Sequence, residues 1–273
     1  MPAWTMWPTR STPATFSRGT NFFKFFQGVK TVVLAAGYAT RLHPLTENFP
    51  KPLLKVQGRS ILDWLLDDVS QADGSAEYVV VTNHKFAPHF REWAEGRPEK
   101  ITLLDDGTIT NEGRLGAVRD LQLAVDSLAL DEDLFVMAGD NLLDFSLKHF
   151  LRYAERKQTS CVMRFYQPDM QKLLKSGVVT VDSDDRILRM TEKSPSPESH
   201  WACPPFYWFL RDDVRLVSEA VADGCGTDAP GSFVAWLCNR VTVHAMEMPG
   251  SRHDIGTLES YEAVCRQYAG IRE

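Results

Sequence analysis

The chain of 273 residues is long enough to bury a substantial core, and its apolar fraction of 44% and charged fraction of 24% are typical of a globular protein. Its net charge of -6 argues against a nucleic-acid-binding surface, and no apolar run reaches the roughly eighteen residues that cross a membrane. The five cysteines form no C-x-x-C pair, which indicates free thiols in a reducing, cytoplasmic setting without a zinc site or disulfide framework.

The first 28 residues differ in composition from the rest of the chain. They contain Arg10, Arg18 and Lys24 but no acidic residue, and they lack the continuous apolar stretch of a secretory signal. An organelle transit peptide is one interpretation of this segment. We favour a disordered or artefactual extension, followed by a single domain over residues 29–273.

A loop with two basic residues follows the first predicted strand, at residues 31–34. It reads LAAGYATRLHPLT over residues 34–46 and PKPL over residues 50–53. Small residues directly after a strand let a backbone approach a ligand closely. Arg41 offers a planar fork and Lys51 a point charge, and both suit phosphate oxygens. The loop therefore predicts a site that binds a polyphosphate and does chemistry on it.

Strand and helix patterns alternate after this loop. Ser60 and Asp63 form the pattern of a capping box at the start of a helix over residues 61–69. Further strands are predicted at 78–82, 101–104 and 134–138, and further helices at 86–95 and 115–128. This alternation predicts a parallel or mostly parallel sheet with helices on both faces.

The second half of the chain has a different pattern, with short strands and few helices between them. The predicted strands are 160–165, 178–181, 187–191 and 205–210. Helices return at 212–222, 231–238 and 257–268. Such a succession predicts an antiparallel extension of the same sheet rather than a second domain.

Asp140 lies in a Gly-Asp-Asn sequence directly after the predicted strand at 134–138. The carboxyl end of a buried parallel strand is where α/β sheets bind ligands. Mg²⁺ binds one or two carboxylates together with phosphate oxygens and waters. A simple β-turn would use the same residues, but beside the phosphate-binding loop we predict that Asp140 is a Mg²⁺ ligand.

The loop at residues 34–53 resembles the signature of the nucleotidyltransferases that join a nucleoside triphosphate to a sugar 1-phosphate. That signature reads LAAGxxTRLxPLT and then PKPL, and every fixed position is met. The resemblance implies an α/β, Rossmann-like three-layer sandwich with a mixed, mostly parallel sheet, similar to the glycosyltransferase-A fold. Its nucleotide half would span about 29–145 and its acceptor half about 146–273. The implied products are an NDP-sugar and pyrophosphate.

The resemblance also implies roles for individual residues. Arg41 and Lys51 would be catalytic. Asp254, in a D-x-G-T turn before a helix, would complete the Mg²⁺ site with Asp140, whereas His253 beside it is not assigned to the metal. Gly116 stands where relatives present a helix start to the nucleobase, and that start could offer N–H groups to an acceptor edge. The nucleotide contacts implied in this way are Leu34, Ala35, Ala36, Gly37, Gly116 and Asp140.

Acceptor contacts are implied at Gly177, Glu192 and Lys193. The last two resemble an E-K-P element whose lysine contacts the acceptor phosphate, although Ser194 replaces the proline and an ordinary charged strand end would explain the pair. Two prolines at 204–205 remove backbone donors from a strand near the acceptor. A non-hexose acceptor such as phosphocholine therefore stays open.

Three alternatives accompany this prediction. The first is a cytidylyltransferase acting on an alcohol phosphate such as phosphocholine. The second is a non-catalytic nucleotide-binding regulatory protein, which need not keep a pair of metal-binding carboxylates. The third is an NAD-binding oxidoreductase, against which the missing G-x-G-x-x-G argues. The expected partners are a nucleoside triphosphate and a phosphomonoester, with neither nucleic acid nor membrane, and a homo-oligomer is left open; the nucleobase is not predicted.

Overall fold

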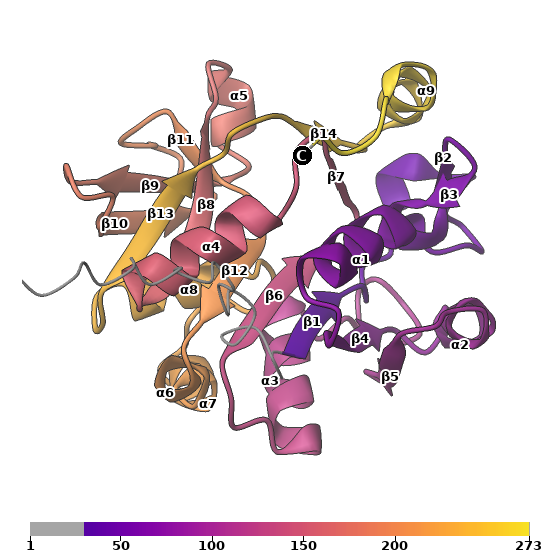
Figure 1. The fold of residues 1–273 in the computed structure, drawn as a ribbon, viewed down its shortest axis with the longest axis horizontal. Coiled ribbons are helices and arrows are strands. Elements are labelled where there is room, and N and C mark those ends of the chain that lie inside the picture. The colour runs from indigo at the N-terminus through magenta and orange to yellow at the C-terminus, as the bar shows by residue number, and fades with distance from the viewer. Residues whose placement is uncertain (1–29, 273) are drawn as a thin grey trace, which may run out of the picture.

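The computed structural model describes residues 30–272 (Figure 1), so the predicted extension at 1–28 lies outside the described residues. Its centre is a 10-stranded mixed sheet in the order β10-β9-β11-β8-β12-β6-β1-β4-β5, with β13 pairing with β8. One sheet thus runs through both halves of the chain, as the sequence predicts. No helix in the described part of the chain is long and apolar enough to cross a membrane.

The N-terminal part of the described chain supplies four parallel strands. They are β1 (Lys30–Leu34), β4 (Glu77–Thr82), β5 (Lys100–Asp105) and β6 (Leu134–Ala138). In β1, Leu34 pairs with Val81 of β4 and Ala138 of β6, so the three strands end at one edge. Loops that follow parallel strands in register converge at that edge, which is where the site lies.

The C-terminal part of the described chain extends the sheet mainly with antiparallel strands. They are β8 (Ser160–Tyr166), β9 (Gly177–Val181), β10 (Ile187–Glu192), β11 (Trp201–Cys203) and β12 (Phe206–Phe209). Strand β13 (Val243–Glu247), which the sequence did not predict, runs parallel to β8. Two short two-stranded sheets are separate from the main sheet. One pairs β2 (Lys55–Val56) with β3 (Arg59–Ser60), and the other pairs β7 (Asn141–Leu143) with β14 (Arg252–Asp254).

Helices cover both faces of the sheet, and the predicted three-layer arrangement is confirmed (Figure 1). Val33 of β1 faces a core with α1 (Ile61–Ala72), α2 (Ala87–Glu95) and α4 (Lys148–Lys157). Its neighbour Val32 faces the opposite core, with α3 (Ala117–Leu128), α7 (Val217–Ala222) and α8 (Gly231–Leu237). Burial on both faces explains why these strands read as continuous apolar runs. The remaining helices are α5 (Met170–Leu173), α6 (Arg211–Val214) and α9 (Leu258–Gln267).

The local predictions hold where a side chain caps a helix. Ser60 accepts a hydrogen bond from the Asp63 N–H at 2.9 Å, and Asp63 accepts one from the Ser60 N–H at 3.0 Å, which is the predicted capping box. The single helix predicted at 212–222 is wrong, because α6 and α7 are separate. The Leu216 N–H bonds back to the Asp213 carbonyl, a tighter turn than the α-helix allows. Helix α4 was not predicted.

Candidate active site

The backbone of the signature loop that follows β1 is held in place by hydrogen bonds to β4 and to Asn83. The Ala35 N–H donates to the Val81 carbonyl at 2.8 Å, and the Asn83 side-chain amide donates to the Ala36 carbonyl at 2.9 Å. A Cβ at Gly37 would meet no atom within 4 Å, so this backbone borders open space. A ligand can therefore approach the loop closely at Gly37.

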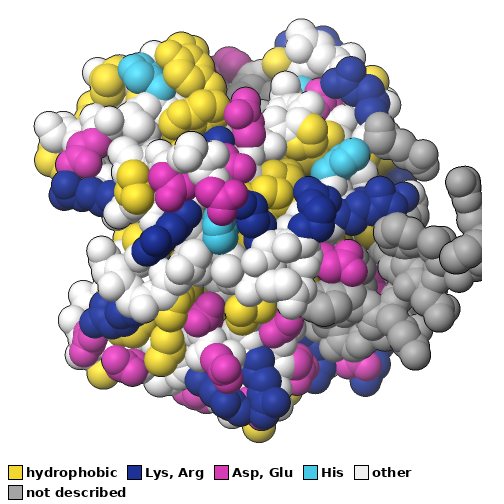
Figure 2. All heavy atoms as spheres, turned by 60° about the vertical axis from the view of Figure 1, so that its left-hand side comes forward, with side chains coloured by type: hydrophobic (Ala, Val, Ile, Leu, Met, Phe, Trp, Pro, Cys, Tyr) yellow, Lys and Arg dark blue, Asp and Glu magenta, His cyan; other side chains and the backbone are white. Residues whose placement is uncertain are grey.

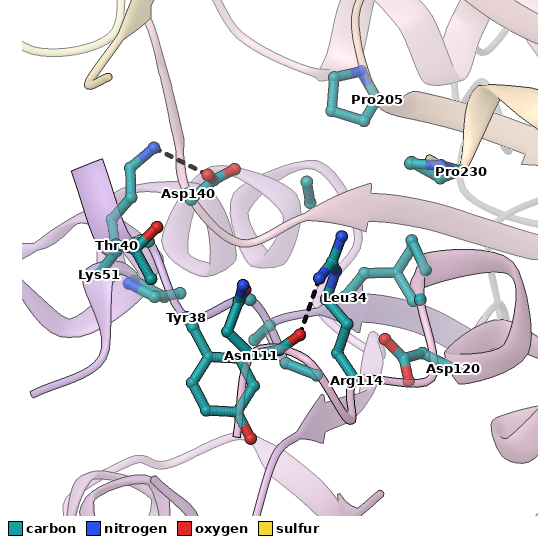
Figure 3. Close-up of a pocket in the computed structure, with 18 of the residues that line it drawn as sticks. Leu34, Tyr38, Thr40, Lys51, Asn111, Arg114, Asp120, Asp140, Pro205 and Pro230 are labelled. Carbon is teal, nitrogen blue, oxygen red and sulfur yellow. Dashed lines mark hydrogen bonds and ion pairs between the residues drawn. The ribbon is translucent and has the colours of Figure 1, made fainter. Parts of the chain in front are cut away.

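Two adjoining cavities lie along this edge of the sheet. The first, of about 580 Å³, contains every predicted nucleotide and catalytic residue in its lining: Leu34, Ala35, Ala36, Gly37, Arg41, Lys51, Gly116 and Asp140 (Figure 3). The second, of about 760 Å³, is lined by Gly177, Glu192 and Asp254 among others. Arg41 and Gly256 border both cavities. Lys193 lines neither.

Lys51 and Asp140 form an ion pair at the floor of the first cavity (Figure 3). The Lys51 Nζ lies 2.7 Å from Asp140 Oδ2, and the lysine side chain is only 7% exposed. Burial alone would raise the pKa of Asp140, but the charges of Lys51 and Arg252 outweigh it, and the pKa lies below its ordinary value. Asp140 is therefore ionised at neutral pH, as a metal ligand must be.

The ladder between β7 and β14 brings Asp254 close to Asp140. Asp254 pairs with Asn141, the residue that follows Asp140. The Asn141 amide donates to Asp140 Oδ1 at 2.9 Å and its oxygen accepts from Arg252 at 2.6 Å. Arg252 in turn lies 3.9 Å from Asp254. The ring of His253 packs edge to face against Tyr268, with centroids 5.5 Å apart.

The carboxylate oxygens of Asp140 and Asp254 suit a hard cation whose remaining ligands come from a bound substrate and from water. Within residues 30–272 no group of three or more His, Cys, Asp or Glu side chains is arranged to hold a metal. Asp140 directly precedes β7 and Asp254 ends β14, opposite Asn141, so the two strands place both carboxylates in one corner. Such a pair fits Mg²⁺ only if phosphate oxygens and waters complete the shell, which is how Mg²⁺ binds in nucleotide sites.

Glu192 occupies a space that two glycines leave free in the second cavity. A Cβ at Gly177 would lie 2.8 Å from Glu192 Oε2, and a Cβ at Gly231 would contact the same carboxylate and lie 2.8 Å from Met190. Burial, reinforced by the nearby Asp228, raises the pKa of Glu192 to about 7, against the opposing charge of its neighbour Lys193. The carboxyl is thus positioned to exchange hydrogen bonds with a ligand in this cavity.

Asp228, in the lining of the first cavity, forms ion pairs with Arg114 and Lys193. It accepts from Arg114 Nε and Nη2 at 3.0 and 2.8 Å, and from Lys193 Nζ at 2.8 Å. Hydrogen bonds from both partners hold the pKa of Asp228 below its usual value. Lys193 is therefore paired in this structure and would have to leave Asp228 to bind a phosphate. No sequence pattern marks Asp228, because its partners come from distant segments.

Gly116 begins α3 in a conformation with φ +89°, and a Cβ there would lie 2.5 Å from the Thr227 carbonyl oxygen. The N–H groups of Ala117 and Val118 already donate to the Asp228 and Thr227 carbonyls, at 3.3 and 3.0 Å. The expectation that the start of α3 offers free N–H groups to a ligand is therefore wrong for the N–H groups of Ala117 and Val118. They hold a loop in place instead.

A parallel core with helices on both faces and cavities along its carboxyl edge defines a Rossmann-like α/β protein. The sequence matches the Nucleotidyl transferase family over residues 30–270. The chain belongs to this family, as its signature loop predicts.

Relatives of the chain are named for different nucleotides and substrates. The chain is 27% identical over 243 residues to the "UTP--glucose-1-phosphate uridylyltransferase AglF" of Haloferax volcanii, covering 85% of this chain and 93% of that protein. It is 26% identical over 226 residues to the "Bifunctional protein GlmU" of Methanocaldococcus jannaschii, covering 82% of this chain and 50% of that one. The chain thus spans only about half the length of this GlmU.

Solved structures share the fold at low sequence identity. A UDP-glucose pyrophosphorylase complexed with UDP-glucose superposes with a TM-score of 0.75 at 19% identity, covering 88% of this chain and 98% of that one. A putative glucose-1-phosphate thymidylyltransferase from Bacillus anthracis gives 0.73 at 18% identity, covering 90% and 97%. These likenesses establish the architecture.

Proposed function

We propose that this protein joins a nucleoside triphosphate to a sugar 1-phosphate, giving an NDP-sugar and pyrophosphate. An oxygen of the acceptor phosphate would form a bond to the α-phosphorus while the bond from that phosphorus to the pyrophosphate oxygen breaks. The observation that carries this proposal is the junction of the two cavities. Asp140 borders the first cavity and Asp254 the second, and Arg41 borders both.

Phosphoryl transfer of this kind needs alignment and charge neutralisation more than covalent participation by the protein. Asp140 and Asp254 would hold a Mg²⁺ ion, which when bound supplies positive charge to the phosphate oxygens. Lys51, fixed by Asp140, would stabilise charge on the α-phosphoryl group. Arg41 would neutralise the triphosphate and the leaving pyrophosphate.

The second cavity would bind the acceptor. The Glu192 carboxyl and the backbone at Gly177 would contact sugar hydroxyls, and Lys193 would bind the acceptor phosphate after leaving Asp228. Gln167 and Gln171 add hydrogen-bonding groups to the lining. A sugar suits these groups better than a quaternary ammonium, which aromatic faces bind. We therefore rank phosphocholine below a sugar 1-phosphate.

The names of relatives agree with this reaction class. AglF is named for UTP and glucose 1-phosphate, and a protein of Thermosipho melanesiensis, 23% identical over 252 residues, is named glucose-1-phosphate adenylyltransferase. Because their nucleotides differ, the family alone does not select the base.

The test is pyrophosphate release with Mg²⁺, using ATP, CTP, GTP, UTP and dTTP against glucose 1-phosphate, mannose 1-phosphate and phosphocholine. We expect release with a sugar 1-phosphate, lowered at least about 10²-fold in Asp140→Asn. Asp126→Asn, on the exposed side of α3, is the matched control and should keep the wild-type rate. Nucleotide binding without release for any pair would favour the non-catalytic regulatory alternative.

A further inference from the structure

Asp120 is a buried carboxylate in the lining of the first cavity that the proposed reaction does not use. It lies one turn into α3, where its N–H donates to the Gly116 carbonyl at 2.9 Å. The residue is 5% exposed. Figure 3 shows its carboxyl group across the pocket from the Lys51–Asp140 pair.

The surrounding protein does not satisfy this carboxylate. Its Oδ1 is buried and has no hydrogen-bond partner among residues 30–272. Burial, reinforced by the like charge of Asp106, raises the pKa of Asp120 to about 7. Burying an unpaired carboxylate costs several kcal/mol, and most buried polar groups have a partner. Asp120 therefore weakens the fold, and its position in a ligand cavity suggests that the partner is the ligand.

The position of Asp120 indicates which part of a nucleotide it would meet. Lys51 and Asp140 take the phosphate end of the cavity under the proposed function. Gly116 and Asp120 lie at the other end, on α3, with the apolar side chain of Leu34 in the same lining. A flat base between Leu34 and the start of α3 would present its hydrogen-bonding edge to Asp120.

We infer that Asp120 reads the nucleobase and selects guanine, an inference that rests on the proposed function. Above a pH of about 7 Asp120 is ionised, and an ionised carboxylate only accepts hydrogen bonds. Guanine presents two adjacent donors, N1–H and the 2-amino group, to its two oxygens. Adenine and cytosine set a ring acceptor beside their amino group, and uracil and thymine place one N–H between two carbonyl oxygens. Each of these bases would place a lone pair against an oxygen of ionised Asp120, and this repulsion would disfavour the base.

The experiment measures nucleotide binding by titration calorimetry with Mg²⁺ and no acceptor, at about pH 8, above the pKa of Asp120. We expect GTP to bind about 10- to 100-fold more tightly than ITP, which lacks the 2-amino donor, because a hydrogen bond to a charged group is lost. ATP, CTP, UTP and dTTP should bind more weakly than GTP by a similar or larger factor. These comparisons use the wild-type protein and need no variant.

The variant Asp120→Asn replaces a hydrogen-bond acceptor by a donor at one position. The amide of Asn donates a hydrogen bond where the carboxylate accepted one, and xanthine carries a carbonyl where guanine has its amino group. We expect this variant to lose its preference for GTP and to bind XTP more tightly than GTP. Asp126→Asn, which faces solvent on the same helix, should keep the wild-type order.

Two results would overturn the inference. One is a wild-type protein that binds another triphosphate as tightly as GTP, or ITP as tightly as GTP. The other is a folded Asp120→Asn variant with an unchanged ratio of GTP to XTP affinity. The proposed function fails separately: selective GTP binding without pyrophosphate release for any acceptor would refute the reaction alone. Release that is fastest with UTP would refute the base assignment alone.

Discussion

Replacing Gly116 by alanine tests how closely the start of α3 packs against the loop at Thr227 and Asp228. At φ +89° an alanine is strained by about 1–3 kcal/mol, because its side chain disfavours this backbone conformation. Its Cβ would also lie 2.5 Å from the Thr227 carbonyl oxygen and 3.0 Å from the Asp228 Cα. These are backbone atoms, so a loop must move, and overpacking of this kind costs about 1–3 kcal/mol.

The two costs together predict a loss of about 2–6 kcal/mol in the free energy of unfolding. For a protein of this size each kcal/mol lowers the melting temperature by about 2–4 °C, so we expect a decrease of about 4–24 °C in Gly116→Ala. Displacement of the loop also moves Asp228 away from Arg114, and nucleotide affinity should fall with stability.

The assay is thermal unfolding followed by circular dichroism, with Gly74→Ala as the control. A Cβ at Gly74 would meet no atom within 4 Å, in an exposed turn, so that variant should unfold within about 1 °C of wild type or slightly higher. If Gly116→Ala melts as wild type does, then α3 and the Thr227 loop are not packed as described, and the reasoning is refuted.

Three further predictions concern single groups of the site. Lys51→Met leaves the Asp140 carboxylate unpaired and should lower the rate of pyrophosphate release about 10²–10³-fold, whereas the exposed Lys55→Met should not. Gly231→Ala forces the flexible side chain of Glu192 aside, so we expect the KM for the acceptor to rise about tenfold while the KM for the nucleotide stays unchanged. Because the pKa of Glu192 rises from 4.5 to about 7 on folding, the folded protein binds more protons than the unfolded chain between these values. The contribution of Glu192 to the free energy of unfolding should therefore fall by up to about 3 kcal/mol between pH 4 and 8. Urea unfolding at a series of pH values measures this decrease.

Each of these has an outcome that would contradict it. Lys51→Met with more than half the wild-type rate would remove Lys51 from the proposed chemistry. A Gly231→Ala variant that changes both KM values equally would indicate a global rearrangement. Glu192→Gln should flatten the decline in stability with pH, and an unchanged slope would mean that another group causes it.

The sequence by itself determined the features that depend on neighbouring residues. The parallel strands were predictable because burial on both faces requires continuous apolar runs, as at β6. The capping box at Ser60 was predictable because both of its hydrogen bonds span three residues. The signature loop also identified the family, and the structure gathers its residues around one cavity. Helix α4 escaped prediction, since its segment is strongly polar and only its inner face, including Phe150, is buried.

Only the tertiary structure decided which charged groups meet. Arg252 bonds to Asn141 across 111 positions of sequence, and through this ladder Asp254 comes beside Asp140. Asp228 meets Arg114 across 114 positions. Periodicity and caps carry no information about such contacts, because they depend on how distant strands and loops pair. The same holds for Asp120, whose burial and lack of a partner follow from the packing of α3 against the sheet.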